Sequence, residues 1–127
     1  AAQPRAGSNS PCSRLGNMLS EPMMLIGRDI LLAFVAGEKR RAANRAAALE
    51  KAIANWTAEV GKAPWRHPMD VKAMYRSADA VGNNRIVFDL CGNRYRLVAK
   101  VNYAARVIEV RFIGTHDAYD GIDARTV

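Results

Sequence analysis

The side chains best suited to chemistry lie in the last third of the chain, where cationic residues recur between apolar ones. Guanidinium presents paired N–H donors that match the oxygens of a phosphate, so Arg96 and Arg111 are candidates to clamp one. Imidazole changes its charge near neutral pH, which makes His116 the first candidate for proton transfer. Tyr119 could donate or accept a proton, or stack on a base. Further candidates for holding a phosphate backbone are Arg85, Arg94 and Lys100.

Each of these residues also has a purely structural interpretation. The cationic positions could simply form the hydrated face of a half-buried sheet. His116 could fix the last loop with Asp120 as its partner. Glu109 could be a base, or it could merely pair with a neighbouring arginine. The Asp residues near His116 suggest a metal site, but no second His supports one, so we expect neither a metal nor a cofactor.

Three strands would position these side chains, because apolar and charged residues alternate in them. The strands span residues 85–90, 94–103 and 106–113, with turns at Cys91-Gly92-Asn93 and Ala104-Ala105. One predicted face is apolar, with Ile86, Phe88, Leu90, Tyr95, Leu97, Ala99, Val101, Ile108, Val110 and Phe112. The other carries Arg85, Asp89, Arg94, Arg96, Lys100, Asn102, Glu109 and Arg111. Like charges side by side on a sheet cost stability, so this excess of cations favours an anionic ligand.

Helices are predicted ahead of the sheet. Residues 28–36 carry apolar side chains on one helical face, with Gly37 as the stop and residues 38–41 as a charged link. Residues 42–61 form the clearest helix, and its apolar stripe should pack on the apolar face of the sheet. Shorter expected elements are an edge strand at 24–26, a helix at 68–74, an extended segment at 77–81 and one helical turn at 117–121. The sequence therefore predicts an α+β fold, a small antiparallel sheet with N-terminal helices packed on one face.

Charge and composition narrow the class of partner. The 127 residues include 19 Lys and Arg against 12 Asp and Glu, a net charge of +7, which favours nucleic acid or an acidic protein. Residues 1–22 lack hydrophobic periodicity, so we expect a disordered leader before a single domain at residues 23–127. Cys12 and Cys91 are expected to be free thiols in a reducing cytoplasm. No apolar run is long enough to span a membrane.

Several blocks of sequence, taken in order, carry a family resemblance. They are Asn83-Asn84-Arg85-Ile86-Val87-Phe88, Gly92-Asn93-Arg94-Tyr95-Arg96-Leu97-Val98, Lys100-Val101-Asn102-Tyr103, Arg111-Phe112-Ile113-Gly114-Thr115-His116 and Tyr119-Asp120, with Trp65, Pro68, Asp70, Lys72 and Tyr75 upstream. Over residues 24–127 the chain resembles the HigB family of toxins from bacterial type II toxin–antitoxin systems. These toxins are similar in fold to the RelE-like ribonucleases.

The resemblance implies a cytoplasmic, metal-independent endoribonuclease (an mRNA interferase) that cuts mRNA on the translating ribosome. Such cleavage uses the 2′-hydroxyl of the RNA as nucleophile and needs a base, cations for the phosphorane charge and an acid for the leaving 5′-oxygen. The catalytic residues would be Arg96, Arg111, His116 and Tyr119. The implied partner is a helix-turn-helix antitoxin of the HigA type, through which alone the toxin would reach operator DNA. The competing interpretation is a basic module that binds RNA or the ribosome without cleavage.

Overall fold

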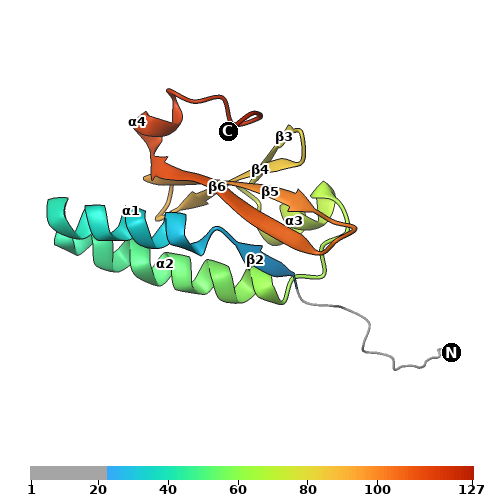
Figure 1. Cartoon of the computed structure of the whole chain (residues 1–127), viewed down its shortest axis with the longest axis horizontal. Helices are drawn as coiled ribbons and strands as arrows, with labels where there is room; N and C mark the ends of the chain where they lie inside the picture. Colours follow the sequence, from blue (N-terminus) through green and yellow to red (C-terminus); the bar gives the residue numbers. More distant parts are fainter. Residues whose placement is uncertain (1–22) are drawn as a thin grey trace, which may run out of the picture.

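A computed structural model describes residues 23–127 of the chain. The predicted leader at residues 1–22, with Cys12, lies outside the described residues. The elements in chain order are β2 (Met24–Ile26), α1 (Arg28–Arg41), α2 (Ala43–Gly61), α3 (Pro68–Met74), β3 (Asp79–Gly82), β4 (Arg85–Leu90), β5 (Tyr95–Asn102), β6 (Val107–Thr115) and α4 (His116–Tyr119). Helices α1 and α2 cover one side of the sheet, and α4 and the C-terminal end lie on the other (Figure 1).

One five-stranded sheet in the order β2-β6-β5-β4-β3 organises the fold. Strands β3 to β6 are antiparallel neighbours, as the alternation predicted, and β2 adds a parallel edge strand beside β6. The turn between β4 and β5 has positive φ at Cys91 (55°) and Gly92 (72°), as expected for a tight hairpin connection. The α+β prediction is confirmed, with a sheet that is mixed rather than wholly antiparallel.

Helix α1 is longer than the sequence indicated. Gly37 does not stop it, and the predicted charged link at residues 38–41 is its last turn. The prediction was wrong because Glu38, expected in solvent, is 2% exposed and is held by Tyr95 and Arg41. The helix ends at Arg41, and the backbone turns at the next residue, Ala42, where φ is −157°.

The main core lies between the helices and the apolar face of the sheet. Leu49, Trp56 and Val60 of the α2 stripe are almost fully buried there, as predicted. Phe88 is the centre of an aromatic cluster: the Trp56 and Tyr75 rings meet it edge-on at 5.3 Å, and the Trp65 ring stacks on it at 6.1 Å. Burial of this apolar area is the main source of stability for the fold.

A β-bulge in β6 changes which residues face the core. Val110 pairs with Ala99 and Phe112 pairs with Val98, so Arg111 is the extra residue between them. Phe112, predicted on the helix-covered face, instead packs on the opposite face, and Ile113 takes the core side. The alternation in the sequence continues through Arg111 without a break, so it gave no sign of the bulge.

A second, smaller core forms on the face opposite the helices, which we call the open face. Ala124 packs against Val87 and Val98, with Phe112 and Tyr119 around them. The chain after α4, residues 120–127, therefore crosses the open face, which we had expected to be hydrated. We call this segment the C-terminal strap.

Candidate functional site

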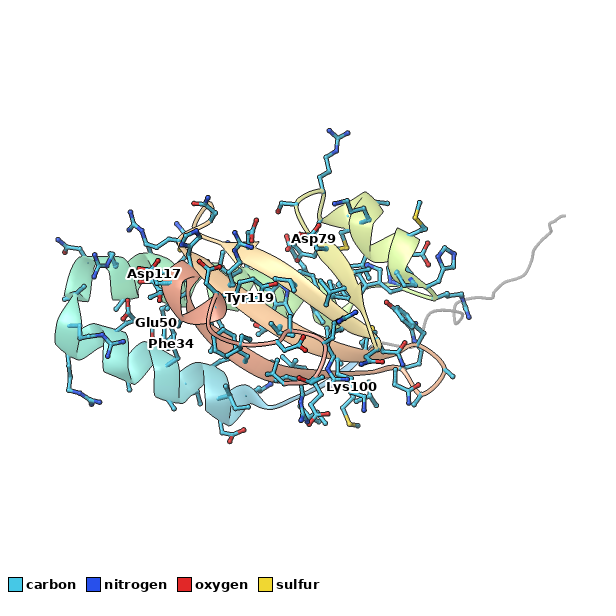
Figure 2. All side chains as sticks on the ribbon, turned by 90° about the horizontal axis from the view of Figure 1, so that it is seen from above. Phe34, Glu50, Asp79, Lys100, Asp117 and Tyr119 are labelled. Carbon is cyan, nitrogen blue, oxygen red and sulfur yellow. The ribbon has the colours of Figure 1, made fainter. Side chains whose placement is uncertain are left out.

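Arginines stand at two ends of the open face, with the small core and the C-terminal strap between them. Arg96 belongs to the end near α4, and Lys100 lies four residues further along β5, about 13 Å away at the usual rise of a strand. Figure 2 looks onto this face, with Tyr119 and Lys100 toward opposite ends of it. Four of the predicted cations, Arg85, Arg96, Lys100 and Arg111, thus lie on the open face without forming one cluster. Arg94, predicted on the same face, instead lines a cavity beside the helix pair, because it belongs to the turn before β5 rather than to the strand.

Arg96 is held by contacts from two elements. Its Nε lies 3.1 Å from Oδ1 of Asp89 on β4, and its guanidinium carbon lies 5.2 Å from the centroid of the Tyr119 ring on α4. The side chain is 22% exposed, so the guanidinium is oriented but still open to solvent on one side. A planar cation fixed in this way is suited to binding a phosphate.

At the other end of the face, two guanidinium groups converge on one oxygen. Arg85 Nη2 donates to the backbone oxygen of Val127 at 2.9 Å, and Arg111 Nε donates to the same oxygen at 3.2 Å. Arg111 also pairs with Glu109 at 2.8 Å, and Lys100 is exposed beside them. Arg96 and Arg111, predicted as a clamp, share the face but have different partners.

His116 begins α4, directly after β6. The hydroxyl of Thr115 caps the helix by accepting from Ala118 N at 3.2 Å, and His116 N donates to the backbone oxygen of Arg94 at 3.1 Å. His116 and Tyr119 are three residues apart on one helical turn, so their side chains are neighbours. The imidazole is half exposed, and its Nδ1 lies 3.4 Å from Asp117 Oδ1. The structural interpretation of His116 had Asp120 as its partner, and the nearest carboxylate is instead that of Asp117.

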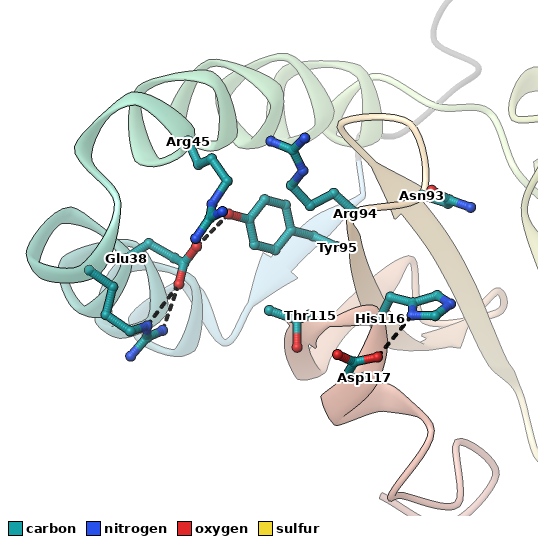
Figure 3. A pocket seen from close by; sticks show the side chains of 9 residues that line it. Glu38, Arg45, Asn93, Arg94, Tyr95, Thr115, His116 and Asp117 are labelled. Atoms are coloured by element: carbon teal, nitrogen blue, oxygen red, sulfur yellow. Dashed lines mark hydrogen bonds and ion pairs between the residues drawn. The ribbon is translucent and has the colours of Figure 1, made fainter.

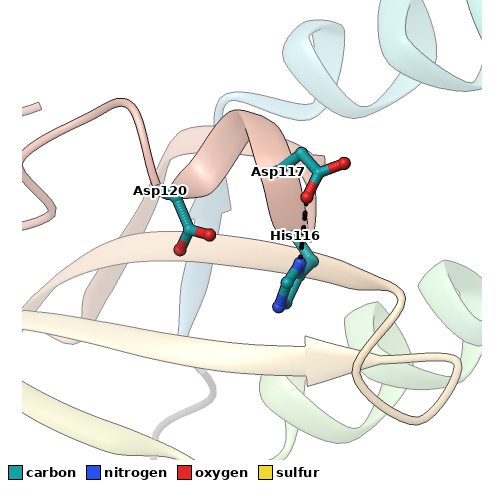
Figure 4. Close-up of side chains that lie close together, drawn as sticks. All are labelled: His116, Asp117 and Asp120. Carbon is teal, nitrogen blue, oxygen red and sulfur yellow. Dashed lines mark hydrogen bonds and ion pairs between the residues drawn. The ribbon is translucent and has the colours of Figure 1, made fainter.

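An exposed cluster surrounds this histidine. Possible ligand atoms of His116, Asp117 and Asp120 lie within 4.8 Å of one another (Figure 4). These are the side chains in the described part of the chain that could hold a metal ion. All three are exposed, and exposed acidic groups often gather without a metal.

A cavity of about 590 Å³ opens between the helix pair and the end of the sheet near α4 (Figure 3). Arg94 and His116, both predicted site residues, line it together with Arg41 and Arg45, which no sequence pattern had indicated. Arg45 lies on α2, outside the helix stripe that packs on the sheet. Folding places Arg45 across the cavity from Asn93 and Arg94 of the β4–β5 turn.

Glu38 supports the wall of this cavity. Its carboxylate accepts from the Tyr95 hydroxyl and from Arg41 Nε and Nη2, the latter two at 3.1 and 2.6 Å. The hydrogen bond from Tyr95 lowers the pKa of Glu38 in spite of its burial, and Arg41 adds to the effect. Burial, followed by the bond to Glu38, raises the pKa of Tyr95. A charged carboxylate bound to a neutral phenol therefore fixes α1 against β5.

The fold and this site define a small basic α+β protein with arginines displayed on one open sheet face. A family model, the HigB toxin, described as the RelE-like toxic component of a toxin–antitoxin system, matches residues 49–122. The chain belongs to this family, and it is therefore the toxin component of such a system, with an antitoxin as its partner. A search of curated proteins found no match. Among residues 23–127, no helix is long and apolar enough to cross a membrane.

Proposed function

We propose that this toxin is a metal-independent endoribonuclease that cuts mRNA on the translating ribosome. The observation that carries the proposal is the contact between Arg96 of β5 and Tyr119 of α4, with His116 on the same short helix. It combines a cation for the phosphate with two groups able to transfer protons. Family membership supports the toxin role, and the net charge of +7 suits an RNA substrate.

In the proposed reaction, the 2′-hydroxyl of the RNA attacks the adjacent phosphorus and loses its proton to a base. The 5′-oxygen of the next nucleotide leaves with a proton from an acid, and a 2′,3′-cyclic phosphate remains. Arg96 stabilises the negative charge that develops on the phosphorane. His116 and Tyr119 supply the proton transfers, since they lie beside one another on α4. DNA has no 2′-hydroxyl and would not be cut.

The second end of the open face would hold the RNA strand away from the cut. Arg85 and Arg111 already hold one oxygen between them, and a phosphate oxygen could take the place of the Val127 oxygen when the strap moves. Lys100 extends this positive surface. Arg111 thus has a binding role in the proposal, because Glu109 and the strap hold it at the far end from Arg96.

Growth arrest tests this proposal. Induced expression of the wild type should arrest bacterial growth, whereas His116→Ala and Arg96→Gln should lose the arrest while accumulating as folded proteins. Arg76→Gln, which removes an exposed charge from the loop after α3, is the matched control and should arrest growth fully. If both site variants arrested growth as fully as this control, the site would be elsewhere.

The antitoxin is proposed to be a helix-turn-helix protein of the HigA type, which would connect the toxin to operator DNA. The proposed place of action is the cytoplasm, where mRNA and ribosomes meet. Co-purification of the toxin with the product of the adjacent reading frame tests the partner. A neighbouring product without a DNA-binding domain would contradict this part of the proposal.

A further inference from the structure

The cavity between the helix pair and the β4–β5 turn has two walls. Arg41 and Arg45, from the end of α1 and the start of α2, form one wall with Glu38. The other wall is built by Asn93, Arg94, Tyr95, Thr115, His116 and Asp117. A volume of about 590 Å³ lies within the range of about 300–1,000 Å³ that is usual for small-molecule sites. The cavity is therefore large enough for a nucleotide.

The charges at the cavity favour an anion. Glu38 is 2% exposed and its oxygens are already bonded to Tyr95 and Arg41, so it offers little negative surface. The Asp117 side chain is 98% exposed and is therefore well solvated. Neither Arg45 nor Arg94 forms a salt bridge with a carboxylate among residues 23–127. Arg94 thus faces the cavity without a paired carboxylate, and Arg45 faces it without a salt bridge, although its charge helps to lower the pKa of the buried Glu38.

The cavity also adjoins the proposed reaction site. His116 belongs to both, and its backbone N–H is tied to the backbone oxygen of Arg94 at 3.1 Å. Arg94 lies two positions before Arg96 along the chain, so both residues belong to the same end of the sheet. A strand of RNA with one phosphate at Arg96 could place a neighbouring phosphate here.

We propose that this cavity binds a phosphate-bearing nucleotide of the RNA strand, next to the cleaved bond, through Arg45 and Arg94. The inference rests on the proposed function and extends it with a substrate subsite. Both side chains are exposed, and the Arg45 guanidinium lies beside the Tyr95 hydroxyl. Asn93, in the turn, offers an amide that can bond to the ribose or base.

Binding of a fluorescent 2′-O-methyl oligoribonucleotide, which cannot be cleaved, tests the subsite. We expect Arg94→Gln and Arg45→Gln each to raise Kd about tenfold, as for loss of a charge-assisted hydrogen bond. Each variant should also lower the slope of log K against log salt by about 0.7, the value for one phosphate contact on a single strand. The matched control Arg76→Gln should change neither quantity. Arg94→Gln leaves the contacts of Glu38 intact, so it remains informative if Arg45→Gln is unstable.

Parallel measurements identify the ligand. Inorganic phosphate should compete only weakly with the oligonucleotide if the cavity recognises a nucleotide in a strand. Strong competition by phosphate that is lost in both variants would instead indicate a site for free phosphate and would overturn the proposal. Kd values for both variants equal to that of Arg76→Gln would also overturn it. Variants that bind the oligonucleotide normally but lose the antitoxin would assign the cavity to the antitoxin instead.

Cleavage on translating ribosomes separates this inference from the function on which it rests. If the wild type cuts mRNA while the variants bind RNA like the control, only the subsite is wrong. If the wild type binds the oligonucleotide and the variants do not, but no mRNA is cut, the subsite stands without the nuclease. Failure of the wild type to bind the oligonucleotide would overturn the subsite directly.

Discussion

The guanidinium carbon of Arg96 lies 5.2 Å from the centroid of the Tyr119 ring, and this contact connects α4 to β5, the central strand of the sheet. Asp89 of β4 lies 3.1 Å from the same guanidinium, so contacts from two elements, β4 and α4, fix this cation of β5. The neighbouring His116 is carried by the same short helix. This relationship makes Tyr119 part of both the scaffold and the proposed chemistry, and the two roles can be separated.

Replacing Tyr119 by Phe keeps the ring under Arg96 and removes only the hydroxyl. We expect thermal stability close to that of the wild type and an mRNA cleavage rate about 100-fold lower, a typical loss for a group that transfers a proton. Single-turnover cleavage on translating ribosomes measures this rate. An unchanged rate would restrict Tyr119 to supporting Arg96, and Tyr119→Ala would then show how much that support contributes.

Tyr95→Phe removes the hydroxyl that donates to Glu38. A hydrogen bond to a buried charged group contributes about 1.5–3 kcal/mol, so the free energy of unfolding should fall by this amount in urea denaturation. Tyr103→Phe is the matched control, since the Tyr103 hydroxyl is buried without a hydrogen-bond partner among the described residues. Its effect should stay within about 0.5 kcal/mol. Equal losses in both variants would contradict the role assigned to the Tyr95–Glu38 bond.

The lowered pKa of Glu38 gives its contribution a defined pH dependence. A carboxyl whose pKa is lower in the folded state stabilises the protein at pH values above its ordinary pKa of about 4.5. This contribution is lost as the pH falls through the lowered pKa. Unfolding at pH 7, 5, 4 and 3 should therefore show the wild type more stable than Glu38→Gln at pH 7, with the difference shrinking below pH 4.5. A difference that stays constant down to pH 3 would mean that Glu38 is not held as a carboxylate.

Gly27 connects β2 to α1 in a conformation that only glycine adopts easily, with φ at +89°. A Cβ at this position would also lie 2.8 Å from the backbone oxygen of Val110. Gly27→Ala should therefore destabilise the protein by at least about 2 kcal/mol in thermal unfolding. Gly61→Ala, at the end of α2 with open space around it, should instead stabilise by up to about 1 kcal/mol. A neutral Gly27→Ala would show that the β2–α1 connection can shift.

The sequence predicted those elements whose periodicity reflects burial on one side. The strands of the hairpins and the stripe of α2 follow from local pattern alone, because Leu49, Trp56 and the apolar strand positions meet one common core. Pattern failed where tertiary contacts decide. Glutamate is usually exposed to solvent, and the burial of Glu38 depends on hydrogen bonds from Arg41 and from the hydroxyl of Tyr95, which is 57 positions away in sequence.

The same distinction applies to the candidate site. The residue types of Arg96, His116 and Tyr119 were enough to predict phosphate binding and proton transfer, and the resemblance to the family supported the choice of these residues. The separation of the cations into two groups on the open face could not be predicted from the sequence. The C-terminal strap and the bulge at Arg111 separate cations that strict alternation would have placed in one row. Arg45 was not predicted as a site residue because it lines the cavity only when α2 packs near the β4–β5 turn, which is distant in sequence.

The most direct test of the central claim is to map new mRNA 5′ ends after adding the purified toxin to translating ribosomes. The account predicts discrete new ends with the wild type, the same ends with Arg76→Gln, and ends reduced by about 100-fold or more with His116→Ala. If the wild type stopped translation without producing any new 5′ ends, the toxin would be a basic module that binds RNA or the ribosome, and the proposed nuclease would be contradicted.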